Sequence, residues 1–204
     1  MTIHRFVLCA MLLSAPVVAC RGGGALNDDP YRQSAIESAL DGGPRVDRAD
    51  GVDFSRYTRV CVAMPTVAPD ATQSDEVSDE QLEKLRNEFA SRMVEAFGKA
   101  SRPASMLGEG AAGAGAIVIR TEIVRAVPNK PLRNIAPQTQ LTRTGYGYAS
   151  VRMYIEDGAT GQTLVTMTDT QSTKRIGAAK LSEWGTVEKA FEFWAGEAVK
   201  LTQQ

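Results

Sequence analysis

Cys20 is the side chain whose surroundings predict the most definite chemistry. A positive start with His4 and Arg5 precedes an apolar run from Phe6 to Val18, and the small Ala19 stands directly before the cysteine. This order is typical of a secretory signal peptide. The apolar run is too short to span a bilayer, which takes about 20 residues. The sequence therefore places a thiol, which is a nucleophile in its thiolate form, next to a predicted cleavage point.

Val17-Val18-Ala19-Cys20 resembles the bacterial lipobox. The resemblance implies that residues 1–19 are a lipoprotein signal peptide and that the thiolate of Cys20, the first residue after cleavage, takes up a diacylglyceryl group. A cleavable signal peptide with an incidental cysteine and a buried N-terminal helix are the alternatives. Because Arg21 rather than Asp follows the anchor, the resemblance also implies an outer-membrane protein that faces the periplasm.

Few other residues have the types or spacing that catalysis requires. The one histidine, His4, lies in the predicted signal peptide, which excludes imidazole chemistry from the secreted chain. Cys61 is the single cysteine besides Cys20 in the secreted chain, and we expect it to pack in the core. G-x-S-x-G and S-x-x-K motifs are absent. We expect no enzyme activity, cofactor or metal ion; a His-independent enzyme and a carrier of an apolar ligand are the alternatives.

Gly108 to Gly113 matches the G-x-G-x-x-G pattern of dinucleotide-binding loops. Such a loop binds a pyrophosphate only when a strand precedes it and a helix follows it. Here a helix pattern precedes the glycines and a strand pattern, Ala116 to Ile119, follows them. We therefore interpret the match as a chance occurrence in a loop.

The composition is that of one globular domain with a tail. The chain has 204 residues, 43% of them hydrophobic, and its 23 Lys+Arg and 24 Asp+Glu give a formal net charge of −1. A nearly balanced charge gives no electrostatic basis for binding nucleic acid. Glycine-rich and acidic runs predict a lipidated flexible tether at 20–51, followed by a single periplasmic domain at 52–204.

Apolar periodicity predicts an α+β fold for this domain. Strands are expected at 58–65, 116–127, 147–156 and 162–173, and helices at 78–97 and 182–201. The order strand-helix-strand-strand-strand-helix indicates a two-layer sandwich, in which two helices cover a mainly antiparallel sheet of about four strands. In the strand 116–127, Arg120 and Glu122 should lie on the face opposite to Ile117, Ile119, Thr121 and Ile123.

The two helices carry end signals and apolar stripes. Ser78 and Gln81 have the spacing of a capping box, and Gly98 suits the stop after the first helix. The stripes comprise Leu82, Leu85, Phe89, Met93, Ala96 and Phe97 in the first helix, and Trp184, Val187, Phe191, Trp194, Ala198 and Leu201 in the second. We expect both stripes to pack on the sheet, although the second could instead form a dimer interface.

The loop 128–145 is the candidate interaction surface of the domain. It holds Lys130, Arg133 and Arg143 together with three prolines, and it has no acidic residue. Loops of this length are usually functional or disordered. A solvated loop without a partner is the alternative.

One strand face also has the residue types of a binding surface. Tyr146, Tyr148 and Tyr154 share this face with Arg152. Aromatic and arginine side chains together can bind a ligand or single-stranded nucleic acid. Because the chain has no net positive charge, packing between neighbouring strands is the interpretation that we favour.

Three segments resemble a known family of bacterial lipoproteins. They are the opening Val52 to Val62, the strand-turn-strand Met153 to Leu164 with its D-x-x-T-G turn, and Trp184-Gly185 with the last helix. The family is that of the domain of unknown function 3313, and the resemblance covers roughly residues 50–200. It implies a secreted lipoprotein without catalytic residues. We therefore expect a non-catalytic binding or structural module whose partner is an envelope protein or peptidoglycan.

Overall fold

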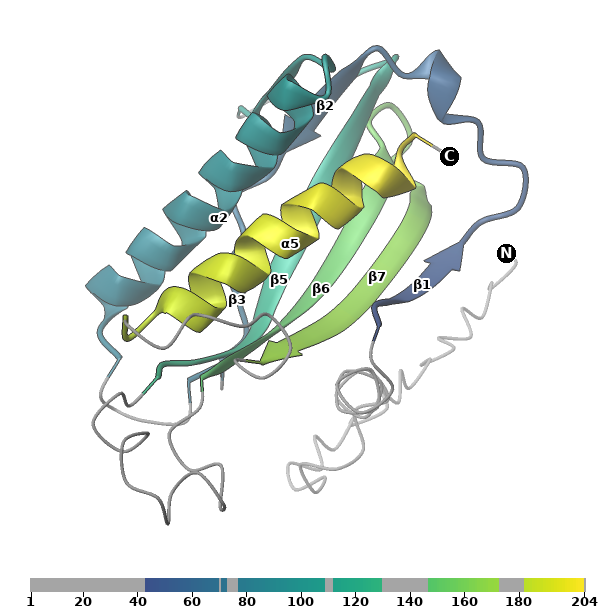
Figure 1. Ribbon diagram of the computed structural model, residues 1–204. Coiled ribbons are helices and arrows are strands. Elements are labelled where there is room, and N and C mark those ends of the chain that lie inside the picture. Colours follow the sequence, from purple (N-terminus) through teal and green to yellow (C-terminus); the bar gives the residue numbers. More distant parts are fainter. Residues whose placement is uncertain are drawn as a thin grey trace, which may run out of the picture.

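The computed structural model describes residues 43–69, 71–72, 77–108, 112–129, 147–172 and 182–203 (Figure 1). No helix in these ranges is long and apolar enough to cross a membrane. The elements in chain order are β1 (Arg45–Arg48), a 3-10 helix (Phe54–Arg56), β2 (Arg59–Val62), β3 (Thr66–Val67), α2 (Asp79–Lys99), β4 (Ala104–Met106), β5 (Ala116–Val127), β6 (Tyr148–Asp157), β7 (Thr163–Ser172) and α5 (Gly185–Leu201).

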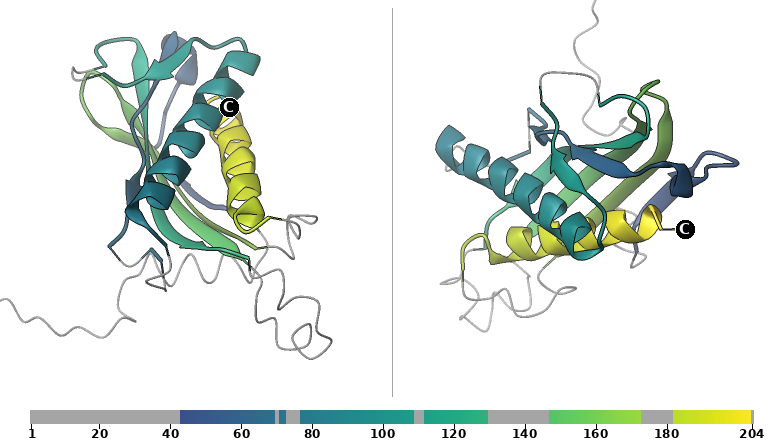
Figure 2. Two further views of the ribbon diagram at one scale, coloured as in Figure 1. Left: turned by 90° about the vertical axis from the view of Figure 1, so that its left-hand side faces the viewer. Right: turned by 90° about the horizontal axis from the view of Figure 1, so that it is seen from above.

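The described strands form one mixed sheet of seven strands. The order is β1-β7-β6-β5-β2-β4, and β3 pairs with β5 beyond the end of β2. β5, β6, β7 and β1 pair antiparallel, whereas β2 and β3 run parallel to β5 and β4 runs parallel to β2. Both α2 and α5 lie on one face of this sheet (Figure 2). The predicted α+β fold with two helices on a sheet is therefore confirmed.

The sheet has more strands than the sequence predicts, and its pairing is mixed rather than mainly antiparallel. β1, β3 and β4 have two to four residues each, and the alternation that identifies a strand needs about four to eight. β2 and β4 are parallel because the chain between them crosses the sheet through α2.

The folded part of the chain begins before the predicted domain boundary at Val52. β1 lies within the predicted tether and pairs with β7 through Arg45 to Arg48. Three of its four side chains are exposed, so β1 has no apolar pattern. β1 is held in place by backbone hydrogen bonds to β7. Such bonds leave no periodic pattern in the sequence.

The core fills the space between the helices and the sheet. The predicted stripes are confirmed: Phe89 and Met93 of α2 and Phe191 and Trp194 of α5 are almost completely buried. The rings of Phe89 and Phe191 stack with centroids 4.4 Å apart. α5 thus covers the sheet, as predicted, and its apolar stripe is occupied within the chain.

The central strand β5 separates the two faces of the sheet. Ile117, Ile119 and Ile123 are at most 1% exposed beneath the helices, whereas Arg120 is exposed and Glu122 is half-buried on the other face. The predicted assignment of faces is therefore confirmed. The hairpin β6–β7 supplies the next two strands of the sheet, also close to the predicted ranges.

Helix α2 begins as predicted but ends later. Ser78 and Gln81 form the reciprocal capping box. Gly98 lies inside the helix, and Ser101, with φ of 58°, occupies the left-handed position after it. The N–H of Arg102 donates to the carbonyl of Phe97 and that of Ser101 to Gly98, each at 3.1 Å. This is the Schellman pattern, so the helix stop at Gly98 was a wrong prediction.

Gly98→Ala tests where α2 ends. No atom lies within 4 Å of the place where a Cβ would stand on Gly98. We therefore expect alanine to raise the free energy of unfolding by about 0.5–1 kcal/mol, because glycine in a helix is entropically costly. Denaturant unfolding measures the change.

Ser101 provides the matched control for this measurement. Ser101→Gly should also stabilise the protein, because glycine adopts the left-handed conformation without steric cost, whereas Ser101→Ala should not. A loss of stability in Gly98→Ala would contradict this account and return the helix stop to Gly98.

Candidate functional site

The four residues that the sequence singles out as sites lie outside the described residues. They are the lipidation residue Cys20 and the basic loop residues Lys130, Arg133 and Arg143. Their roles stay predictions. A different candidate site lies on the described part of the chain, on the face of the sheet opposite the helices.

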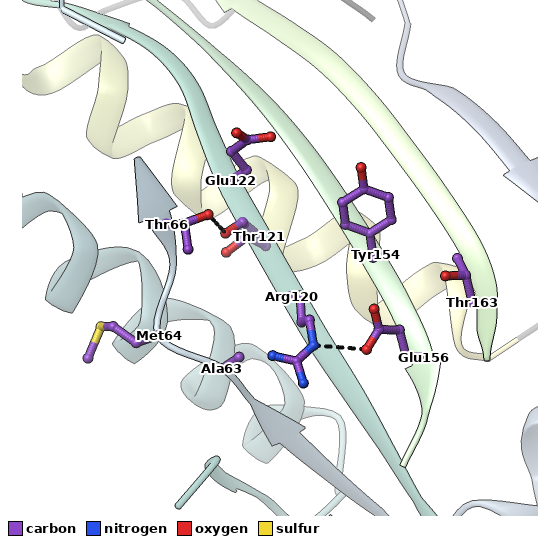
Figure 3. A pocket seen from close by; sticks show the side chains of 9 residues that line it. All are labelled: Ala63, Met64, Thr66, Arg120, Thr121, Glu122, Tyr154, Glu156 and Thr163. Atoms are coloured by element: carbon purple, nitrogen blue, oxygen red, sulfur yellow. Dashed lines mark hydrogen bonds and ion pairs between the residues drawn. The ribbon is translucent and has the colours of Figure 1, made fainter. Parts of the chain in front are cut away.

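This site is a shallow groove of about 310 Å³ between the β2–β3 connection and strands β5 to β7. Figure 3 shows the nine lining residues, which are Ala63, Met64, Thr66, Arg120, Thr121, Glu122, Tyr154, Glu156 and Thr163. Its volume is at the lower limit of the roughly 300–1,000 Å³ that small-molecule sites span. We call it the sheet groove.

A bulge forms one wall of the sheet groove. Val62 is opposite Ile119 and Thr66 is opposite Glu122, so three residues of one strand face two residues of β5. Pro65 lies in this stretch and has no N–H to donate to a neighbouring strand. A bulge tolerates such a residue, because its extra residue is left unpaired. The carbonyl of Pro65 accepts a hydrogen bond from Arg86 Nε of α2 at 2.7 Å. The bulge leaves Met64 38% exposed beside the groove.

Two ion pairs form the floor of the sheet groove. Arg120 Nε donates to Glu156 Oε2 at 2.9 Å, and Arg152 Nη1, just outside the lining, donates to Glu122 Oε2 at 2.8 Å. Both pairs join β5 to β6 across the sheet. Tyr154 lies directly opposite Arg120 in the strand register and therefore stands between the two ion pairs.

Hydroxyl groups and a thioether complete the lining. Thr163 on β7 lies beside Tyr154, whereas Thr66 on β3 lies at the far side of β5 (Figure 3). The Thr66 hydroxyl donates to the backbone carbonyl of Thr121 at 3.4 Å. The groove therefore presents one aromatic ring, paired donors and acceptors, and the apolar Met64. Such a surface can bind a ligand, and each of its carboxylates is already held by a guanidinium.

The sequence identified some of these residues without bringing them together. It predicted that Arg120 and Glu122 share one face of their strand and that Tyr154 and Arg152 share one face of theirs. Glu156 ends the predicted strand 147–156, on the same face as Tyr154 and Arg152, and it lies within β6. These residues become neighbours only through the register of β5 against β6. The pattern of apolar residues within one strand does not reveal that register.

Other sequence features are structural. Cys61 is buried as predicted and packs on this same side of the sheet with Ala112, Ala116 and Val118. Gly113 leads into strand β5 and not into a helix, which agrees with a chance G-x-G-x-x-G match. In the described ranges, no three His, Cys, Asp or Glu side chains are grouped so that they could hold a metal ion.

Asp157 fixes the turn next to the sheet groove. Its Oδ2 accepts from the Tyr57 hydroxyl at 2.7 Å, and its Oδ1 accepts from the N–H groups of Ala159 and Thr160 at 2.9 Å. These hydrogen bonds lower the pKa of Asp157 to about 2, and the bond from Tyr57 has the largest effect. The contact joins the start of the domain to the hairpin turn, two segments 100 residues apart in the sequence.

A family model described as "Protein of unknown function (DUF3313)" matches residues 23–198. The matched range includes all seven strands, the whole of α2 and all but the last turn of α5. The comparison with curated proteins gave no match.

Several solved structures are similar at low identity. The PelC dodecamer from Paraburkholderia phytofirmans is 12% identical, with 78% of this chain and 97% of that chain covered and a TM-score of 0.49. A Xanthomonas campestris protein with the family model DUF330 is 10% identical over 71% and 83%, with a TM-score of 0.44. A DUF4136 family protein from Bacteroides thetaiotaomicron is 9% identical over 78% and 95%, with a TM-score of 0.41. These values leave the function of this chain open.

The low pKa of Asp157 predicts acid destabilisation. Its value of about 2 lies below the ordinary 3.8, so the charged form stabilises the fold above about pH 4, and this contribution is lost as the pH falls to about 2. Denaturant unfolding at several pH values should show a steeper loss in the wild type than in Asp157→Asn.

Tyr57→Phe is the matched variant, because it removes the largest cause of the shift and keeps the buried ring. The pKa of Asp157, followed by NMR of its carboxyl carbon, should move back towards the ordinary value in this variant. A constant stability difference between wild type and Asp157→Asn from neutral pH to about pH 2 would contradict the prediction.

Proposed function

This chain belongs to the DUF3313 family of proteins of unknown function, and we propose that it is a lipid-anchored lipoprotein of the cell envelope with a non-catalytic binding domain. The observation that carries the proposal is the sequence Val17-Val18-Ala19-Cys20 at the end of a predicted signal peptide. A cysteine at this place is the acceptor of lipid in proteins that such a peptide directs to the envelope.

The proposed location is the outer membrane, with the domain in the periplasm. Arg21 follows the proposed anchor, and 24 residues separate Cys20 from the first strand at Arg45. A flexible chain of that length has a root-mean-square span of about 25–30 Å. The folded domain would therefore be held near the membrane but could still contact a partner in the periplasm.

A binding role fits the sheet groove better than catalysis does. Glu122 and Glu156 each bind a guanidinium, and the nine lining residues include neither a histidine nor a cysteine that could serve as base or nucleophile. The alternative of an apolar carrier has less support, because Phe89, Phe191 and Trp194 already fill the space between the helices and the sheet.

Cys20→Ala should abolish lipid attachment. We expect the wild type to incorporate labelled palmitate and to fractionate with the outer membrane, and the variant to do neither, because alanine has no thiolate to acylate. Cys61→Ala is the matched control, since Cys61 is buried in the folded domain. It should label as the wild type does. Palmitate incorporation into Cys20→Ala would contradict the proposed anchor.

A photoreactive amino acid in place of Met64 tests the binding role in living cells. Met64 is 38% exposed beside the sheet groove, and Met106, the matched control, is 42% exposed on the edge strand β4 outside the lining. We expect a defined adduct at position 64, none at 106, and loss of the adduct when Tyr154→Ala is added. Equal adducts at both positions, or none, would argue against a binding domain that uses this groove.

A further inference from the structure

We propose that the sheet groove binds an uncharged oligosaccharide segment. This inference rests on the proposed binding function and names the chemical class of its ligand. Three observations support it: the paired charges of the groove, the pairing of the strands beneath it, and the types of its side chains.

The charged groups in and beside the groove cancel one another. Arg120 is paired with Glu156 and Arg152 with Glu122, at 2.9 and 2.8 Å. All three charged residues of the lining, Arg120, Glu122 and Glu156, are already paired, so a charged ligand would have to compete with one partner of a pair or bring a charge that the groove does not balance. A ligand without net charge can bind while both pairs stay intact.

The backbone beneath the groove cannot bind an extended peptide as an added strand. β5 is paired with β6 from Ile117 to Val127, and β6 is paired with β7 from Tyr148 to Glu156. Strand addition requires an unpaired edge. Over β5 and β6, recognition must therefore be made by side chains, which disfavours a peptide main chain as the ligand. β3 at the border of the groove has only two residues and is too short to receive an added strand.

The side chains offer the contacts that a sugar ring uses. A guanidinium has five N–H donors and a carboxylate has several acceptor positions, so an Arg–Glu pair can donate to one hydroxyl and accept from its neighbour. Arg120 is 52% exposed and uses its Nε on Glu156. The flat face of Tyr154 between the pairs suits the C–H face of a pyranose. Thr163 adds a hydroxyl beside the ring, and Thr66 adds another at the far side of β5.

Calorimetric titration of the full-length protein in detergent tests this proposal. The probes are the uncharged tetramer of β-1,4-linked N-acetylglucosamine, its positively charged N-deacetylated form, and a negatively charged galacturonate tetramer. We expect the uncharged tetramer to bind at least about tenfold more tightly than either charged one, a factor that corresponds to about 1.4 kcal/mol.

Variants locate the binding in the groove. Tyr154→Ala should weaken binding of the uncharged tetramer about tenfold or more, whereas Tyr148→Ala, on the same strand face but outside the lining, should not change it. Arg120→Glu should shift the preference to the positively charged tetramer. The double exchange Arg120→Glu with Glu156→Arg should restore the preference for the uncharged one.

Three outcomes would overturn the inference: no binding of the uncharged tetramer, tighter binding of a charged tetramer, or equal effects of Tyr154→Ala and Tyr148→Ala. The proposed function is tested separately by palmitate labelling and by the adduct at position 64. A protein adduct at position 64 without tetramer binding would support the binding domain and refute the oligosaccharide. Failure of both tests would refute the binding domain as well.

Discussion

The structure depends on the burial of one face of the sheet beneath α2 and α5. The stacked rings of Phe89 and Phe191, together with Trp194, fill the contact between the helices and the strands. Trp194 Nε1 also donates to Asp169 Oδ2 of β7 at 2.7 Å, so the polar atom of the largest buried side chain is satisfied, which a core requires. Both helices pack on this face, and the sheet groove lies on the opposite face of the sheet.

A second buried polar cluster fixes the end of the sheet where α5 begins. Asn129 Oδ1 accepts from the N–H of Gly147 at 2.7 Å and from the Thr186 hydroxyl at 3.0 Å, and its amide donates to the carbonyl of Ser182 at 3.0 Å. A Cβ at position 147 would stand 2.8 Å from the carbonyl oxygen of Val127, which explains a glycine there. One amide side chain thus aligns the end of β5, the start of β6 and the start of α5.

The opposite face is shaped by irregular features of the strands. The bulge before Thr66 and the turn held by Asp157 border a surface whose charges are paired across β5 and β6. The Tyr57–Asp157 bond joins two of the segments on which the family resemblance rests. These segments therefore support the geometry of the domain, and the binding chemistry that we propose lies beside them on the sheet.

Local sequence patterns were enough to predict the two helices, the long strands and their buried faces, because each is a period of apolar residues. The capping box is equally local, since Ser78 and Gln81 are three residues apart. The tertiary structure alone decided the short strands β1, β3 and β4, whose places depend on backbone hydrogen bonds to distant partners. It also decided the left-handed Ser101 that ends α2 three residues beyond the predicted glycine. The sheet groove also depends on the tertiary structure. Arg120 and Glu156 are 36 residues apart in the sequence, and only the register of β5 against β6 makes them neighbours. The predicted residues Cys20, Lys130, Arg133 and Arg143 lie outside the described ranges, so the proposed anchor rests on its local sequence motif and stays a prediction.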